Sequence, residues 1–336
     1  LPLSQLWLRQ TIKGDGVWGN ISVETNPNHH SYNYLIVYDA PPTNFYTIVE
    51  KQNRILFLTE PPGSKLYSPF YLCQFGVIIS PFQLPKWVEY FCKLNNCTIK
   101  YRHTSLPWHA GINFSVRPHQ VNKQLSDFAE LNKPIVSKHF LSVVTSNKRD
   151  RPEQIKRLAL IEELQKQLGD KVALFGRGFR EIDDKFDAIF DSQFHLVLEN
   201  NFENNFWTEK LADSYLCWSF PIYVGTSGIE HDFPSDSYFR PNLDLDIAKI
   251  ASQIVARMNQ GLSENDIMEM ARARESVLHF HNLFAVIEAL ISKLPRQDLL
   301  DIPDLIKSNF DPRPKIVIKK IRRFIMKRIR KSVPFK

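Results

Sequence analysis

The stretch FHLVLENNFENNFWTEKLADSYLCWSFPIYVG, residues 194–225, decides the fold class. It opens with an apolar run of strand length, passes through an Asn-rich loop into a segment of helical spacing, and closes on a second apolar run at 221–225. Two buried strands joined by a helix form the unit of a parallel sheet. We therefore expect an α/β protein whose ligand-binding residues follow the carboxyl ends of its strands.

The residues before this stretch have the same alternation. HFLSVVTSN at 139–147 and VALFG at 172–176 are two further apolar runs of strand length. Between them Pro152 is suited to the first turn of a helix and Gly169 to its end. The apolar residues between these limits follow helical spacing, at Ile155, Leu158, Ile161, Leu164 and Leu168.

The N-terminal half also contains apolar runs that end in polar or turn-forming residues. YLIVYDA at 34–40, RILFLTE at 54–60 and FGVIIS at 75–80 predict buried parallel strands. Asn132, Lys133 and Pro134 form a plausible linker, and the pattern restarts after them. The predicted organisation is an N-terminal α/β domain, a second α/β domain and a C-terminal extension, with bounds 1–135, 136–295 and 296–336.

The positive charge is concentrated at one end of the chain. The 336 residues have a net charge of +7, but 11 of the 43 Lys and Arg residues lie in 313–336, which has no acid, so the remainder has 32 basic against 36 acidic residues, a net of −4. A basic groove for nucleic acid is therefore not expected in the body. In the tail Ile318, Ile321, Ile325 and Ile329 form one apolar stripe among cations, which is typical of a helix lying on an anionic membrane. RNA binding, or packing of the tail against the acidic body, is the alternative.

Several common kinds of site lack their sequence signatures. There is no GxGxxG and no GxxxxGK[ST], so the usual dinucleotide and P-loop fingerprints are missing. The four cysteines, at 73, 92, 97 and 217, form no CxxC pair, and we expect buried structural thiols in a reducing compartment. Asp244-Leu245-Asp246 gives a DxD sequence, but it lies where a helix is expected to start, which favours capping over metal binding. No metal site is predicted.

The loop after the strand at 194–199 carries the strongest chemical signal. Thr208, Glu209 and Lys210 fall on the first turn of the following helix, where unpaired N–H groups and a lysine suit a diphosphate. Glu209 can accept hydrogen bonds from ribose hydroxyls. The alternative is that Glu209 and Lys210 lie on an exposed first turn and bind nothing.

These residues resemble the donor-binding signature of the α-1,3-fucosyltransferases of glycosyltransferase family ten. In that signature F-x-x-x-x-E-N is followed by T-E-K, a helix and P-[IV]-x-x-G, and the order and approximate spacing agree here over about 30 residues. The resemblance implies two Rossmann-like domains facing a cleft, the GT-B type, and GDP-L-fucose as donor with no essential divalent metal. It places donor binding on Ser146, Asn147, Arg157, Glu199, Asn200, Trp207, Thr208, Glu209 and Lys210.

Two of these assignments depend on looser matches. In the family a strand ending V-V-[ST]-N precedes an arginine on a helix, which corresponds here to Val143–Asn147 and Arg157, although Lys156, Arg149 and Arg151 compete for that role. A guanidinium binds two phosphates through its fork of donors. The run 54–60 resembles the strand whose trailing glutamate is the family's proposed general base, here Glu60.

Glu60 has two competing interpretations. It follows a buried strand and precedes Pro61-Pro62, so it can instead cap that turn, and Glu199 is the rival carboxylate at a strand end. The family element Y-R-x-D-S resembles 101–105, but His103 stands in place of its acid. The match in the N-terminal half is therefore weaker, as expected if that half binds an acceptor that differs among relatives.

The resulting prediction is an inverting glycosyltransferase that moves L-fucose from GDP-fucose to a hydroxyl of a bacterial glycan of the lipopolysaccharide or O-antigen type. The acceptor is expected to be lipid-linked. The expected location is the inner face of the cytoplasmic membrane, reached through residues 313–336, with no nucleic-acid partner. Alternatives are the same fold with another nucleotide sugar, or a non-catalytic protein that binds a nucleotide or glycan.

Overall fold

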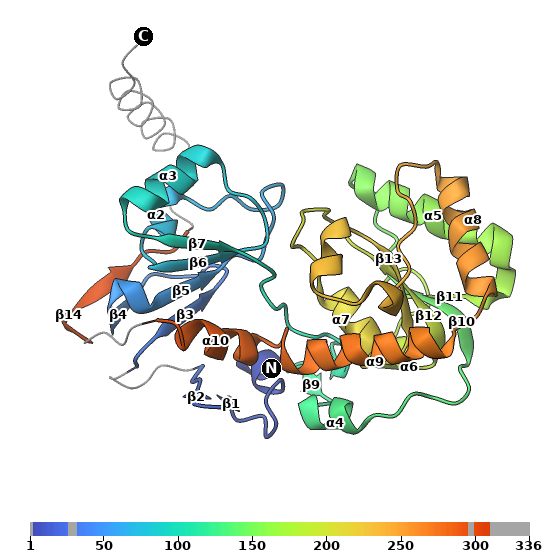
Figure 1. The fold of residues 1–336 in the computed structure, drawn as a ribbon, viewed down its shortest axis with the longest axis horizontal. Coiled ribbons are helices and arrows are strands. Elements are labelled where there is room, and N and C mark those ends of the chain that lie inside the picture. Colours follow the sequence, from blue (N-terminus) through green and yellow to red (C-terminus); the bar gives the residue numbers. More distant parts are fainter. Residues whose placement is uncertain (1–2, 26–31, 295–298, 310–336) are drawn as a thin grey trace, which may run out of the picture. The chain divides into compact units, whose positions relative to one another are not determined.

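A computed structural model of the chain describes residues 3–25, 32–294 and 299–309 (Figure 1). The chain divides into two compact units: the first contains residues 1–25 and 105–289, and the second contains 26–104 and 290–336. This division differs from the predicted bounds, because residues 1–25 and 105–135 group with the later sheet and residues after 290 group with the earlier one. The predicted tail helix at 313–336 lies outside the described residues. The cleft between two domains stays a prediction.

The first unit is built on a four-stranded parallel sheet. Its order is β11 (Val172–Phe175), β10 (His139–Val144), β12 (Ser192–Leu198) and β13 (Phe220–Val224). Four of the predicted strands are thereby confirmed, as is the parallel α/β class. From β10 the chain moves outward to β11 and then returns to β12 on the other side. The carboxyl ends of β10 and β12 therefore form the point where such sheets bind ligands.

Helices cover both faces of this sheet. Right-handed crossovers place α5 (Pro152–Leu168) on one face, and α6 (Lys185–Phe190) and α7 (Glu209–Leu216) on the other. The packing agrees, since α5 contacts α8 (Ile247–Asn259), while α7 contacts both α6 and α9 (Glu264–His279). Figure 1 shows α5 and α8 side by side. The apolar faces of both layers enclose one core.

The sequence signals for α5 are confirmed. Pro152 is its first residue, where a missing N–H costs nothing, and Gly169 ends it with φ +58°, a backbone conformation that side chains disfavour. Leu158, Ile161 and Leu164 point inward and are 3% exposed or less. Burial of such side chains contributes about 1.5–3 kcal/mol each, which fixes the helix against the sheet.

The second unit has its own parallel sheet. The order is β3 (Leu35–Tyr38), β5 (Arg54–Phe57), β6 (Val77–Ser80) and β7 (Thr98–Tyr101). The three strands predicted in this half are confirmed, and β7 is an additional one. All four residues of β5 are buried, which explains why its sequence is a continuous apolar run after Arg54.

A two-stranded antiparallel sheet completes this unit. β4 (Phe45–Val49) pairs with β14 (Leu299–Ile306), which falls in the predicted C-terminal extension. The nearly buried guanidinium of Arg54 reaches Asp304 of β14 at 2.7 Å. On one face of the main sheet α2 (Pro69–Leu72) packs against α3 (Lys86–Leu94).

The remaining elements are short, apart from α10. They are α1 (Leu3–Leu8), β1 (Val17–Trp18), β2 (Ile21–Ser22), β8 (Ile112–Asn113), β9 (Gln120–Val121), α4 (Leu125–Glu130) and α10 (Leu283–Ile291). Among the described residues, no helix has both the length and the apolar character needed to cross a bilayer.

Candidate functional site

The residues expected to bind a donor come together at the switch point of the first unit. Ser146 and Asn147 follow β10, and Glu199 and Asn200 follow β12, its parallel neighbour. Because the carboxyl ends of adjacent parallel strands share one edge of the sheet, these four residues lie on the same edge.

Arg157 joins the two strand ends. It lies on the second turn of α5, where Nη1 donates to Oδ1 of Asn200 at 3.3 Å and Nη2 donates to the carbonyl of Ser146 at 3.5 Å. Its Nε is buried without a hydrogen bond in the described structure, and burial lowers the pKa of the guanidinium. Since both of these partners are neutral oxygens, the charge of Arg157 is not neutralised by them. This is the arrangement of a group that can bind an anion.

The loop after β10 is held close to the loop after β11. The N–H of Asn147 donates to the carbonyl of Arg177 at 3.1 Å, and a Cβ at Gly178 would lie 2.2 Å from Nδ2 of Asn147. Gly178 has φ +83°, a conformation that favours glycine, and a larger residue there would also displace the Asn147 side chain. Thr145, which the sequence did not single out, has a buried hydroxyl with no hydrogen-bond partner among the described residues. An unpaired hydroxyl at this edge is available to a ligand.

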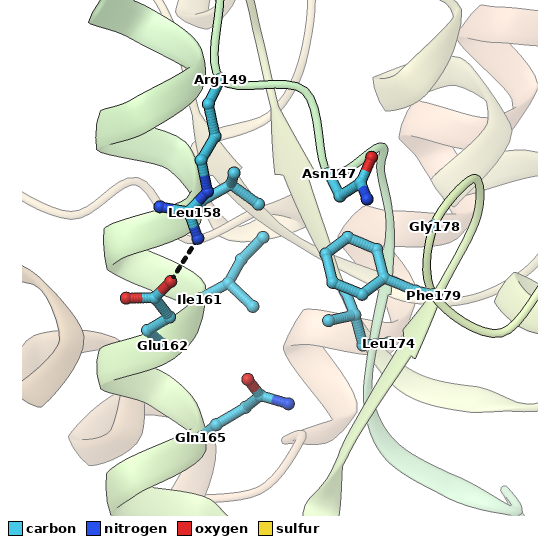
Figure 2. A pocket seen from close by; sticks show the side chains of 9 residues that line it. All are labelled: Asn147, Arg149, Leu158, Ile161, Glu162, Gln165, Leu174, Gly178 and Phe179. Carbon is cyan, nitrogen blue, oxygen red and sulfur yellow. Dashed lines mark hydrogen bonds and ion pairs between the residues drawn. The ribbon is translucent and has the colours of Figure 1, made fainter.

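A pocket of about 250 Å³ lies beside this edge, between α5 and the ends of β10 and β11 (Figure 2). Figure 2 shows Leu158, Ile161 and Gln165 of α5 on one side and Phe179 on the other. The mouth carries an ion pair between the exposed side chains of Arg149 and Glu162, at 2.9 Å. The volume is below the usual 300–1,000 Å³ of small-molecule sites, so this pocket is too small for a whole nucleotide sugar.

The N-terminus of α7 is capped from within the protein. Thr208 is the N-cap residue, and its hydroxyl accepts from the N–H of Lys210 at 3.3 Å. In turn the N–H of Thr208 donates to Glu199 at 2.8 Å, and the hydroxyl lies 2.8 and 3.0 Å from the two oxygens of the same carboxylate. Burial raises the pKa of Glu199. A protein carboxylate therefore lies where the sequence suggested that the helix N-terminus would meet a diphosphate.

Lys210 is likewise surrounded by anions. Its ammonium lies 3.0 Å from the Thr208 hydroxyl, 3.4 Å from Glu209 and 3.7 Å from Glu199. Although burial opposes its charged form, the two carboxylates raise the pKa of Lys210. Burial would by itself raise the pKa of Glu209, but Lys210, His109 and Lys185 together hold it well below its ordinary value. Both side chains are therefore ionised near neutral pH.

Three further residues complete this cluster, and the sequence did not reveal them. Lys185 of α6 lies 3.6 Å from Glu209 and 3.7 Å from Asp213, and His109 lies 3.6 Å from Glu209. Burial raises the pKa of Asp213 to about 6 and lowers the pKa of His109 to about 4. The one available signal was Asp213 itself, an acid one helical turn after Glu209 in the segment LADSYL.

The charges of this cluster decide what it can bind. Two lysines face the carboxylates of Glu199, Glu209 and Asp213, so the group has no excess of positive charge. A diphosphate would have to displace these carboxylates from Lys210. Arg157 needs no such displacement, and it is therefore the stronger candidate for the first contact with an anion. The donor-binding roles of these residues stay predictions.

Trp207 precedes the N-cap residue of α7, and its side chain is buried. It is 3% exposed, its indole N–H donates to Asp232 at 2.7 Å, and its ring packs edge-on against Phe233 and His281. This side chain belongs to the core that supports the loop before α7. Its donor-binding role stays a prediction.

Glu60, the predicted base, lies in the second unit. It is an exposed residue three positions after the end of β5, and its N–H donates to the hydroxyl of Tyr67 at 3.2 Å. The same hydroxyl donates to Asp39, at the end of the neighbouring strand β3, which also pairs with Lys65 at 2.7 Å. Asp39 is thus a second carboxylate at this edge that the sequence did not single out. Of these two carboxylate residues, Glu60 is exposed and Asp39 is half-buried.

The acidic pair at 244–246 has a structural role. The carboxylate of Asp246 accepts from the N–H of Lys249 at 2.9 Å and caps α8, which confirms the capping interpretation. Within the described ranges no group of three His, Cys, Asp or Glu side chains is arranged to hold a metal ion.

Comparison with known families identifies the unit that contains Arg157. Residues 136–259 match the family model described as "Glycosyltransferase family 10 (fucosyltransferase) C-term". Over this segment the chain is similar to the family 10 glycosyltransferase domain. The resemblance inferred from residues 194–225 is confirmed over this segment, and so is the prediction that the chain is a glycosyltransferase enzyme.

The family 10 domain and the rest of the chain are also similar to solved structures. An α1,3-fucosyltransferase crystallised with GDP is 17% identical over 80% of this chain and 79% of that one, with a TM-score of 0.43. The same enzyme type with GDP-fucose is 17% identical over 81% and 82%, with a TM-score of 0.41. A trehalose-6-phosphate synthase is 12% identical over 73% and 67%, with a TM-score of 0.41. No curated protein matches the sequence.

Proposed function

We propose that the protein transfers L-fucose from GDP-L-fucose to a hydroxyl of a bacterial glycan, with inversion at the anomeric carbon. The family 10 domain supports the reaction class. The observation that carries the proposal is Arg157, a half-buried guanidinium that joins the ends of β10 and β12 through neutral oxygens. A diphosphate supplies the pair of anionic oxygens that such a fork binds.

In this proposal the first unit binds the donor. Arg157 holds the diphosphate beside Ser146, Asn147 and Asn200, and Glu209 accepts hydrogen bonds from the ribose. As the donor binds, Lys210 exchanges one carboxylate partner for a phosphate oxygen. Its ammonium lies 3.4 Å from Glu209 and 3.7 Å from Glu199, longer than a tight ion pair, which favours such an exchange. These cations stabilise the charge that builds up on the departing GDP, the role that a metal fills in other enzymes. No divalent metal is required.

The second unit supplies the acceptor side. Glu60 takes the proton of the acceptor hydroxyl as the anomeric carbon acquires oxocarbenium character. Its exposed position after β5 and the hydrogen bond from its N–H to Tyr67 support this role, since they hold the backbone while leaving the residue at the surface. The acceptor is a glycan of the lipopolysaccharide or O-antigen type, attached to a lipid.

The proposed location is the inner face of the cytoplasmic membrane. It is supported by the 11 cations and the apolar stripe of residues 313–336, against a net charge of −4 in the remainder. A lipid-linked acceptor and a membrane-bound enzyme then lie on the same membrane surface, so the two meet by diffusion within that surface.

The donor assignment is tested by thermal shift with a panel of nucleotide sugars. A ligand that binds only the native state raises its melting temperature, and we expect the largest rise with GDP-fucose and GDP. Slow hydrolysis of GDP-fucose distinguishes an enzyme from a protein that only binds. A larger shift with UDP sugars would favour the same fold with another donor, and binding without turnover would favour a non-catalytic role.

A further inference from the structure

Three of the four cysteines gather in the second unit. Cys73 follows α2, Cys92 lies in the last turns of α3, and Cys97 precedes β7. Each of the three thiols shifts the pKa of another, so they lie close to one another. None of the roles proposed above uses them, and their sequence positions alone suggested only buried structural thiols.

The end of α3 brings two of these cysteines together. Asn96 has φ +54°, and the chain turns back so that the N–H of Cys97 donates to the carbonyl of Cys92 at 3.0 Å and the N–H of Asn96 donates to that of Lys93 at 3.1 Å. These are the two hydrogen bonds of a Schellman motif, in which the side chains corresponding to Cys92 and Cys97 usually meet in an apolar contact. Here both positions are cysteines, so the turn brings the two residues that a disulfide would join close together.

The third cysteine lies against the same turn. α2 packs on α3, and Sγ of Cys73 lies 4.0 Å from the carbonyl of Phe91, the residue before Cys92. Cys73 is half-buried, whereas Cys92 and Cys97 are buried. A molecule as small as a peroxide can therefore approach the group from the side of Cys73.

A lysine completes the group. Nζ of Lys51 donates to the carbonyl of Asn95 at 2.6 Å, which places its charge beside Cys97, two residues further on. Sγ of Cys97 lies 3.5 Å from the carbonyl of Asn95, the same carbonyl that Lys51 contacts. The neighbouring thiols of Cys73 and Cys92, together with Lys51, lower the pKa of Cys97 against the opposing effect of burial. The other two thiols and burial raise the pKa of Cys73. Cys97 is therefore the thiol of the group that ionises most readily.

We propose that Cys92 and Cys97 form a peroxide-sensitive dithiol, in which Cys97 reacts with the peroxide and Cys92 closes a disulfide. The Cys97 thiolate attacks one oxygen of hydrogen peroxide, the O–O bond breaks, and a sulfenic acid forms while hydroxide leaves. The hydroxide takes the proton of the Cys92 thiol. The resulting thiolate attacks the sulfur of the sulfenic acid and displaces a second hydroxide, which becomes water by taking from solvent the proton that Cys97 released when it ionised. Two thiols and one peroxide thereby give one disulfide and two waters.

The cluster favours this chemistry over metal binding. The ammonium of Lys51 adds a positive charge beside the thiolate and so repels a cation. The described residues also contain no group of three His, Cys, Asp or Glu side chains arranged for a metal ion. A cysteine beside a lysine and two further thiols is instead the environment of a reactive cysteine.

Peptide mapping of the full chain tests the proposal directly, because trypsin places each cysteine of the group on its own peptide. Cleavage after Lys86, Lys93 and Lys100 separates Cys92 from Cys97. The protein is treated with a small excess of hydrogen peroxide at pH 6.5, and free thiols are then blocked with iodoacetamide. We expect peptides 87–93 and 94–100 joined by a disulfide that dithiothreitol reverses, with Cys217 still reduced.

Variants separate reactivity from simple proximity. Cys97→Ser should abolish peroxide consumption by the group, and Cys92→Ser should leave a Cys97 sulfenic acid that dimedone traps. Lys51→Met removes the charge without altering any thiol, and it should slow disulfide formation at pH 6.5 roughly tenfold. Lys93→Met, an exposed lysine on α3, serves as the charge-matched control and should form the disulfide at the normal rate. Because this change removes the cleavage between the two cysteines, its disulfide is read as peptide 87–100 with both cysteines protected from iodoacetamide.

Three results would overturn the proposal. They are the absence of the linked peptide pair, oxidation of Cys217 at the same rate as Cys97, and an unchanged rate in Lys51→Met. Melting temperatures of each variant, measured in reducing buffer, establish that the folded protein is compared. Lys51→Met keeps the test decisive if a cysteine variant fails to fold.

Discussion

At the scale of single residues, Arg157 and Lys210 look alike in the sequence but differ in their surroundings. Both are cations expected at a diphosphate, yet the carboxylates of Glu199 and Glu209 surround Lys210, whereas Arg157 contacts two neutral oxygens. The sequence could place both near the strand ends. It could not show that carboxylates neutralise Lys210. Glu199 follows β12 whereas Lys210 lies on α7, and only the folded structure brings the two side chains together.

This difference predicts unequal effects of substitution. Arg157→Ala should weaken GDP binding by about 1.5–3 kcal/mol, the range for a lost hydrogen bond to a charged group. Arg157→Lys should recover only part of this, since an ammonium lacks the planar fork. Calorimetric titration with GDP measures the loss, and Lys156→Ala, an exposed neighbour on α5, is the control. Equal affinity in Arg157→Ala and the parent protein would place the diphosphate elsewhere.

Glu60 allows binding and chemistry to be measured separately. Glu60→Gln keeps the size of the side chain but cannot take a proton, so turnover should fall on the order of 10²–10⁴-fold while GDP affinity changes little. Turnover and GDP affinity are measured on the same preparation. Asp39→Asn is the comparison, because Asp39 is the other carboxylate at this edge and pairs with Lys65. Near-normal turnover in Glu60→Gln, with a large loss in Asp39→Asn, would transfer the role of base to Asp39.

At the scale of elements, a buried carboxylate on α7 binds the backbone of the segment that precedes β8. Oδ1 of Asp213 accepts from the N–H groups of His109 and Ala110 at 2.9 and 3.0 Å, and the side chain is fully buried. Burial raises its pKa to about 6 against the attraction of Lys185. The charged form of Asp213 is therefore disfavoured in the folded protein.

A pH dependence follows from this shift. Because the folded pKa of Asp213 is above the ordinary value, the folded state binds more protons than the unfolded state between about pH 4 and 6, and this group destabilises the fold as pH rises through that window. Asp213→Asn keeps the acceptor oxygen but cannot ionise. Relative to the parent, the variant should gain stability on going from pH 4.5 to 7, by on the order of 1–3 kcal/mol.

The depressed pKa of His109 acts in the opposite direction. The unfolded state binds more protons there, so its contribution to stability rises between about pH 4 and the ordinary histidine value. The measured quantity is therefore the difference between Asp213→Asn and the parent, in which the shared His109 contribution largely cancels. Melting curves at pH 4.5, 5.5 and 7 provide it. A difference that does not change with pH would show that Asp213 has the same pKa in the folded and unfolded states.

The elements also show why part of the fold was predictable. The buried parallel strands appear as continuous apolar runs, and Pro152 and Gly169 fix the limits of α5, so seven strands and this helix follow from local sequence. The pairing of β14 with β4 depends on residues about 250 positions apart, and the sequence of β14, LLDIPDLI, alternates poorly. The grouping of residues 105–135 with the later sheet depends in part on buried contacts such as Asp213 with His109, which no local pattern reveals.

At the scale of the whole molecule, the charge is divided between an acidic body and a basic end. Residues 313–336 hold 11 cations and no acid, and the remainder has a net charge of −4. Attraction to an anionic surface should therefore depend on the tail alone. Each basic residue near such a surface contributes about 1 kcal/mol, and this contribution falls as salt screens it.

Removing residues 313–336 should accordingly abolish binding to vesicles that contain anionic lipid, while hydrolysis of GDP-fucose is retained. Co-sedimentation with vesicles of 30% phosphatidylglycerol, at about 0.1 and 0.5 M salt, measures the binding and its screening. A full-length variant with Ile321 and Ile325 changed to Ser keeps every charge but interrupts the apolar stripe. If the stripe inserts among the lipids, this variant should bind weakly and lose that binding at high salt, whereas the parent keeps part of it, because burial of apolar side chains is not screened. Equal binding by the truncated and full-length proteins would transfer the membrane contact to the body, and a preference of the tail for RNA over vesicles would reject the membrane role.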